Sequence, residues 1–103
     1  MSLSLPAFEM AGSGPDAVLL LHGIGGGAAM WSEQGSGSLA ALAALGLRAV
    51  AVDLPGYGGS AALGPVTLAG MVDAVVALIG TLAPRRVALV GHSMGGMVAQ
   101  ELA

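Results

Sequence analysis

The sequence contains no cysteine, and this absence excludes a disulfide framework, a thiol nucleophile and a thiolate metal site. Its two histidines, His22 and His92, have no partner at metal-ligand spacing, so we expect no metal site. Charge is also scarce, because three basic and six acidic residues give a formal net charge of −3. Three arginines cannot form the basic stripe that holds a phosphate backbone, so we expect no nucleic-acid partner.

Long hydrophobic runs are missing as well. No apolar stretch approaches the roughly 20 residues that a membrane-spanning helix needs. Residues 1–14 lack the basic start and the sustained apolar segment of a secretory signal. From these absences we expect no membrane partner and a cytoplasmic location.

Hydrophobic residues, in contrast, are abundant. They make up 55% of the 103 residues, while charged residues make up 9%, against about 25% in a typical soluble domain. A free-standing domain of this length has a large surface for its volume and needs more charge than this. We therefore expect residues 1–103 to be the N-terminal part of a single, larger domain whose other segments cover the apolar faces.

Short apolar segments of strand length recur along the chain. Residues 17–21, 48–52 and 85–90 are nearly uninterrupted apolar runs, which are typical of strands buried on both faces of a parallel sheet. A further short strand is expected over residues 5–10. Each of the three longer runs ends in glycine or in turn-forming residues, so we expect loops where these strands end.

Helical periodicity appears between and after these strands. Ser38 and Thr67 are the expected N-caps of helices that end near residues 45 and 82, and a third helix is expected over residues 94–103. The apolar stripe expected on the second helix consists of Leu68, Val72, Val75, Ile79 and Leu82. Strands that alternate with helices in this way predict an α/β fold with a mostly parallel sheet and flanking helices.

Residues 91–95 read Gly-His-Ser-Met-Gly and match the pattern G-x-S-x-G. The pattern is common by chance in a chain with 18 glycines, but here an apolar strand leads into it and a helical segment leads out. Such a strand-to-helix turn strains the backbone at Ser93, projects its hydroxyl above the sheet and directs helix N–H groups at developing negative charge. We predict Ser93 to be a nucleophile, and the alternative is a serine in an ordinary glycine-rich turn.

Residues 22–27 read His-Gly-Ile-Gly-Gly-Gly and follow the first of the three long strands. Glycines let this backbone approach a substrate, so we predict that the N–H groups of Ile24 and Met94 form an oxyanion hole. Two alternatives stay open: the glycines only turn the chain, or G-x-G-x-x-A over residues 23–28 binds a dinucleotide. In the second alternative Asp53 would bind a ribose hydroxyl, although it lies further along the chain than the usual 20 or so residues.

Three other polar residues invite a catalytic interpretation that the sequence does not favour. Asp53 opens a turn rich in proline and glycine, so we expect it to accept backbone N–H groups rather than to serve as a triad acid. His22 is expected to make a structural hydrogen bond. His92 is adjacent to Ser93 and is expected to point away from it.

Together these motifs resemble the α/β-hydrolase superfamily, and within it the esterase, lactonase and haloperoxidase-like branch. The resemblance begins at residue 12 and consists, in order, of Gly12-x-Gly14-Pro15, Leu20-Leu21-His22-Gly23, Trp31, Asp53-Leu54-Pro55-Gly56-Tyr57-Gly58-x-Ser60 and Gly91-His92-Ser93-Met94-Gly95-Gly96. It implies a partial α/β-hydrolase fold, a small-molecule acyl substrate and no cofactor. It also implies Ser93 as nucleophile and the N–H groups of Ile24 and Met94 as oxyanion hole. Members with aspartate at this turn, such as haloalkane dehalogenases and epoxide hydrolases, are expected to resemble the chain less, because residue 93 is serine.

The same resemblance implies an acid and a histidine that follow the serine in the chain. The residues after Ser93 include one acid, Glu101, and no histidine. We therefore expect a truncated form that lacks the triad acid and histidine, the cap and the C-terminal strands, and that is inactive alone. The complete enzyme is expected to act on a carboxylic ester, lactone or thioester through an acyl-enzyme on Ser93.

Three other functions stay open. The chain could belong to an acyltransferase of the same fold, to a non-catalytic binding or scaffold protein that retains the turn, or to a split enzyme whose second chain supplies the acid and histidine. A sheet that ends in an open edge would also allow self-association through that edge.

Overall fold

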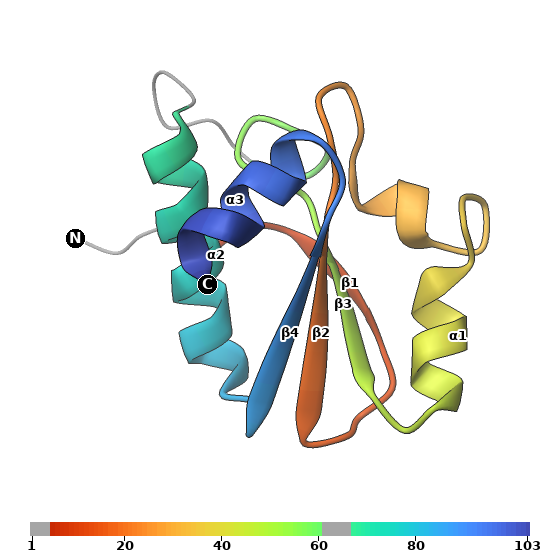
Figure 1. The fold of residues 1–103 in the computed structure, drawn as a ribbon. Coiled ribbons are helices and arrows are strands. Elements are labelled where there is room, and N and C mark those ends of the chain that lie inside the picture. The colour runs from red at the N-terminus through yellow and green to blue at the C-terminus, as the bar shows by residue number, and fades with distance from the viewer. Residues whose placement is uncertain (1–4, 61–66) are drawn as a thin grey trace.

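A computed structural model describes residues 5–60 and 67–103, and Figure 1 shows its fold. The elements along the chain are β1 (Phe8–Ala11), β2 (Asp16–Leu21), the 3-10 helix η1 (Ala28–Trp31), α1 (Ser38–Ala44), β3 (Arg48–Val52), α2 (Leu68–Leu82), β4 (Arg86–Gly91) and α3 (Met94–Leu102). The sheet has the order β1-β3-β2-β4, in which β1 is antiparallel to β3 and the other pairs are parallel. The predicted mostly parallel α/β fold is confirmed.

β2 is one of the two inner strands of the sheet and is hydrogen-bonded on both sides. Leu19 is in register with Val50 of β3 and with Leu89 of β4. Residues 17–21 are all buried, which confirms that this apolar run forms a strand covered on both faces.

Helices cover both faces of the sheet, with α2 and α3 on one face and α1 and η1 on the other (Figure 1). Because side chains alternate along a strand, each face has its own core. The core under α2 and α3 contains Leu19, Leu21, Val50, Val52, Leu54, Met71, Val75, Leu78 and Val98. The core under α1 and η1 is smaller and contains Val18, Leu20, Ala28, Leu39, Ala49 and Ala51. Burial of each leucine or valine stabilises the fold by about 1.5–3 kcal/mol.

The helix N-termini confirm one predicted cap and correct the other. The Thr67 hydroxyl accepts a hydrogen bond from the Gly70 N–H at 3.0 Å, so Thr67 caps α2 as expected. Ser38 is instead the first residue of α1, and Gly37, with a φ of 75°, occupies the cap position. The Ser38 hydroxyl bonds to the Ser36 hydroxyl at 2.6 Å, which explains why it does not cap the helix.

β4 is an edge strand, and it lies one residue later than the predicted range of residues 85–90. Its side chains are largely uncovered, with Val87 40% and Val90 42% exposed. Self-association through this edge stays a prediction. Among the helices of the described residues, none is long and apolar enough to cross a membrane.

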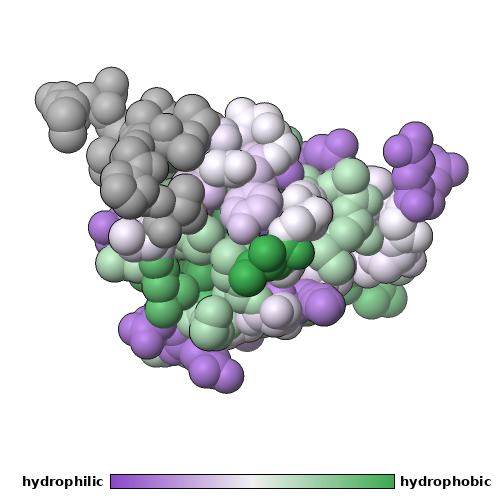
Figure 2. Space-filling view, turned by 90° about the horizontal axis from the view of Figure 1, so that it is seen from above, coloured by the Kyte–Doolittle hydropathy of each residue, from purple (hydrophilic) through white to green (hydrophobic). Residues whose placement is uncertain are grey.

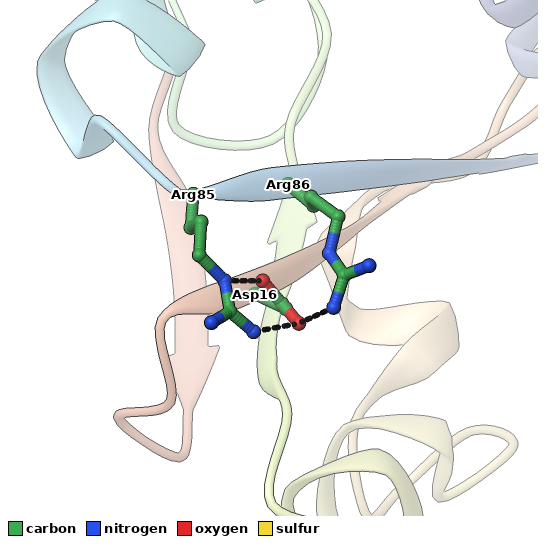
Figure 3. A network of polar contacts seen from close by, with 3 residues as sticks. All are labelled: Asp16, Arg85 and Arg86. Atoms are coloured by element: carbon green, nitrogen blue, oxygen red, sulfur yellow. Dashed lines mark hydrogen bonds and ion pairs between the residues drawn. The ribbon is translucent and has the colours of Figure 1, made fainter.

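A charged cluster joins the starts of β2 and β4, at the end of the sheet opposite to the glycine-rich loops (Figure 3). Arg85 donates through Nε and Nη2 to the two Asp16 carboxylate oxygens, both at 3.0 Å, and Arg86 Nη2 donates to Oδ2 at 3.2 Å. Hydrogen bonding to Arg85, and then to Arg86, lowers the pKa of Asp16 from its usual 3.8 to about 2. The same contact with Asp16 raises the pKa of Arg85.

Asp16→Asn tests this cluster. Since the folded-state pKa of Asp16 is depressed, its stabilising effect is fully present above pH 3.8 and is lost as the pH falls towards 2. The melting temperature of the variant should be lower than that of the unmodified chain at pH 6, and the difference should disappear near pH 2. Salt should reduce the difference at pH 6, because the cluster is solvent-exposed. Asp73→Asn, at an exposed position on α2, is the control, and an equal effect of both substitutions would contradict the assignment.

Candidate active site

The turn between β4 and α3, residues 91–95, is called the elbow below. Ser93 lies in it with φ 56° and ψ −112°, and Ala83 is the other non-glycine residue with positive φ in the described part of the chain. Such a conformation costs about 1–3 kcal/mol. Ser93 is exposed, and its hydroxyl makes no capping hydrogen bond to α3, although it occupies the cap position. The predicted sharp bend is confirmed.

Gly91 and Gly95, the first and last residues of the elbow, have no room for a side chain. A Cβ on Gly91 would lie 2.3 Å from the carbonyl oxygen of Gly95, and a Cβ on Gly95 would lie 2.2 Å from the carbonyl oxygen of Leu21. At Gly96, one residue further, an added Cβ would have the Gly91 carbonyl oxygen as its nearest neighbour, at 3.6 Å, which is an ordinary contact distance. The first turn of α3 therefore packs with its backbone against the backbone at the end of β2.

Residues 22–27, called the glycine loop below, lie against the elbow. A Cβ on Gly23 would be 3.2 Å from Ser93 Cβ, and the His92 N–H donates to the Leu21 carbonyl at 3.0 Å. Ile24 is 77% exposed. Among the hydrogen bonds between described residues, none uses the N–H of Ile24 or of Met94. The two loops that the sequence analysis singled out are thus neighbours. Figure 2 views this end of the sheet and shows a small, strongly hydrophobic patch near the middle of the surface, bordered by residues of intermediate hydropathy.

His22 is fully buried and makes two hydrogen bonds to backbone. Its Nε2 accepts from the Leu54 N–H at 3.0 Å, and its Nδ1 lies 2.8 Å from the Gly23 carbonyl oxygen. Because the Leu54 N–H can only donate, Nε2 carries no proton, and Nδ1–H is the donor to Gly23. The expected structural role of His22 is confirmed.

Asp53 has both carboxylate oxygens occupied. Oδ1 accepts from the Ala28 N–H at 2.7 Å, and Oδ2 accepts from the Gly59 N–H at 3.0 Å. This confirms the expected acceptor role. The dinucleotide alternative is wrong, because the glycine loop leads into a four-residue 3-10 helix and not into an α-helix whose N-terminus could hold a pyrophosphate.

The turn formed by residues 53–60, called the proline loop below, contributes two residues that the sequence analysis did not single out. The Tyr57 ring meets the His22 ring edge-on at 5.0 Å, and its hydroxyl lies 4.0 Å from Met94 Sδ. The Ser60 hydroxyl donates to the Asp53 carbonyl and accepts from the Ala7 N–H at 2.7 Å. Both belong to a recognised motif, but a single tyrosine or serine in a turn carries no chemical signal until its neighbours are known.

The described residues do not complete a catalytic triad. No hydrogen bond among residues 5–60 and 67–103 joins Ser93 to either histidine or to an acid. Glu101 is exposed and lies eight positions along α3, roughly 12 Å from the elbow at 1.5 Å per residue. No group of three or more histidine, aspartate or glutamate residues in this part of the chain is arranged to hold a metal.

A mostly parallel sheet that ends in a strained serine elbow beside a glycine loop is the architecture of an α/β hydrolase. The chain belongs to the alpha/beta hydrolase family, whose model matches residues 18–103. It is 38% identical over 96 residues to a pimeloyl-[acyl-carrier protein] methyl ester esterase of Pectobacterium atrosepticum, a match that covers 93% of this chain and 34% of that protein. The chain spans about a third of the length of the curated relatives it matches.

Solved structures show the same likeness. An epoxide hydrolase from Vigna radiata superposes with a TM-score of 0.81 at 38% identity, over 92% of this chain and 30% of that one. An esterase from Exiguobacterium antarcticum gives a TM-score of 0.77 at 34% identity, over 92% of this chain and 34% of that one. The expectation that epoxide hydrolases resemble the chain less is therefore wrong for the backbone.

Gly95→Ala and Gly96→Ala form a matched pair that tests the packing of the elbow. Gly95→Ala should lower the free energy of unfolding by about 3 kcal/mol or more, because its Cβ meets backbone that cannot retreat. Gly96→Ala should be neutral or raise it by up to about 1 kcal/mol, since the site has room and alanine favours helix. Urea denaturation followed by circular dichroism measures both, and equal stability of the two variants would contradict this packing of the helix on the strand end.

Proposed function

We propose that the chain carries the nucleophile and the oxyanion hole of a serine hydrolase that acts on a carboxylic ester, lactone or thioester. Ser93 is the nucleophile, and the N–H groups of Ile24 and Met94 are the oxyanion donors. The observation that supports this most directly is the conformation of Ser93, an exposed serine in a strained turn beside the glycine loop. Its hydroxyl makes no hydrogen bond to any other described residue. The similarity to esterases supports the same reaction class.

In the proposed reaction, Ser93 Oγ attacks the substrate carbonyl carbon while a base accepts the hydroxyl proton. The carbonyl oxygen becomes an oxyanion and is stabilised by the two N–H groups, aided by the positive end of the α3 dipole. Collapse of this intermediate expels the alcohol or thiol, which takes the proton from the base, and leaves an ester on Ser93. Water then attacks this acyl-enzyme while the base accepts a proton from it. The bond between the acyl carbon and Ser93 Oγ breaks, the base returns the proton to Oγ, and the acid is released.

The base and its orienting acid are proposed to come from outside residues 1–103. His22 cannot serve, because both ring nitrogens are engaged with backbone groups in the buried interior. Asp53 is likewise committed to two N–H groups. On this proposal the chain by itself is inactive, and the complete protein that contains it is the active enzyme.

Ser93→Ala in the complete protein tests the proposal. Hydrolysis of p-nitrophenyl butyrate should fall by roughly 10⁴-fold or more, because the acyl-enzyme can no longer form. Ser36→Ala, at an exposed loop position remote from the elbow in sequence, is the matched control and should leave the rate unchanged.

A fluorophosphonate probe provides a direct reading of the nucleophile. It should label the complete protein on Ser93, as located by mass spectrometry of the modified peptide, and should not label the Ser93→Ala variant. Ester hydrolysis that survives Ser93→Ala, or labelling at a different residue, would overturn the assignment.

A further inference from the structure

The peptide unit between Gly23 and Ile24 contains one of the two proposed oxyanion donors. Its bond is trans, so the Gly23 carbonyl and the Ile24 N–H point in opposite directions from one rigid plane. Whatever holds the Gly23 carbonyl therefore also determines where the Ile24 N–H points.

Two donors hold that carbonyl. His22 Nδ1–H donates to it over 2.8 Å and the Gly26 N–H donates to it over 3.0 Å. Both bonds are made at the carbonyl end of the peptide unit, away from the Ile24 N–H. Consecutive hydrogen bonds polarise one another. A carbonyl oxygen that accepts two hydrogen bonds therefore makes the N–H of the same peptide unit a better donor.

The His22 ring is itself held from two directions. The Leu54 N–H binds Nε2 at 3.0 Å, and the Tyr57 ring contacts it edge-on at 5.0 Å with an interplanar angle of 67°. The Tyr57 hydroxyl reaches Met94 Sδ at 4.0 Å, and Met94 provides the other proposed donor. His22 and Tyr57 thus connect the glycine loop, the proline loop and the elbow through contacts beneath the reactive surface.

We propose that His22 is a positioning residue that orients and polarises the Ile24 N–H for the oxyanion, with Tyr57 supporting its ring. This inference rests on the proposed function. On this proposal His22 helps to stabilise the oxyanion in the transition state, in addition to stabilising the fold. Its imidazole transfers no proton.

His22→Gln and His22→Asn separate this role from simple packing, since each retains one half of the imidazole. A glutamine amide reaches the place of Nε2 and can still accept from Leu54, but it lacks the donor to Gly23. An asparagine amide reaches the place of Nδ1 and can still donate to Gly23, but it lacks the acceptor for Leu54. A positioning role predicts that the glutamine variant is the less active of the two at equal folded fraction.

The measurement is hydrolysis of p-nitrophenyl butyrate and inhibition by phenylboronic acid, a tetrahedral adduct former, in the complete protein. His22→Gln should lower kcat by about 10-fold or more with little change in KM, and should raise the inhibition constant of the boronic acid by a similar factor. His22→Asn should stay within about threefold of the unmodified protein in kcat. Val72→Ala, a truncation in the same core on α2, controls for a general loss of stability.

Amide hydrogen exchange supplies a reading that needs no activity. In the substrate-free complete protein, the Gly26 N–H should exchange faster in His22→Gln than in His22→Asn, because its acceptor carbonyl is no longer fixed. Tyr57→Leu should change kcat in the direction of His22→Gln, because it removes the ring that contacts His22 edge-on. This variant keeps the test decisive if a substitution at the buried His22 prevents folding.

The outcomes separate this inference from the proposed function. If Ser93→Ala abolishes hydrolysis while both His22 variants lose activity only in proportion to their folded fraction, the positioning role is wrong and the nucleophile assignment stands. Equal exchange at Gly26 in the two His22 variants would overturn the positioning role in the same way. If hydrolysis survives Ser93→Ala, the proposed function fails, and the positioning role fails with it.

Discussion

The close approach of α3 to the end of β2 is the contact on which the rest of this end of the molecule depends. With no side chain at Gly95, the first turn of the helix packs directly on the Leu21 carbonyl. This approach leaves no room for a gradual turn, so the chain must reverse at Ser93, which takes positive φ. The same strand end then continues into Gly23, which lies against Ser93. A strained serine and a glycine loop beside it are thus two consequences of one backbone contact.

Two buried or half-buried polar side chains, His22 and Asp53, organise the loops around this contact. His22 binds the backbone of Gly23 and Leu54. Asp53 binds the backbone N–H groups of Ala28 and Gly59. Each side chain thus satisfies backbone groups of two segments and joins them. Both nitrogens of His22 and both carboxylate oxygens of Asp53 form hydrogen bonds that hold the loops. The molecule in this way separates the groups that shape the site from Ser93, the group proposed to react.

The likeness to both an epoxide hydrolase and an esterase shows how little of the chemistry is determined by the backbone. Superposition at similar TM-scores over 92% of this chain means that its backbone arrangement is shared by enzymes with different names. The side chains placed on this common frame decide the reaction, and a functional assignment therefore depends on the residue at position 93 and its surroundings.

The sequence by itself determined the elements and the place of the elbow. Apolar runs of four or five residues predict buried strands, and G-x-S-x-G between such a run and a helical segment predicts the bend, because local sterics there admit little else. The start of α1 was misplaced by one residue, since Ser38 bonds to Ser36 instead of capping. Only the tertiary structure decided which side of α2 is buried: Met71 and Leu78 are covered, while Leu68, in the expected stripe, is 37% exposed. A helix that is apolar nearly all round has no preferred face until its neighbours are placed. The same holds for Tyr57, whose contacts with His22 and Met94 join three loops that are distant along the chain and meet only when the sheet forms.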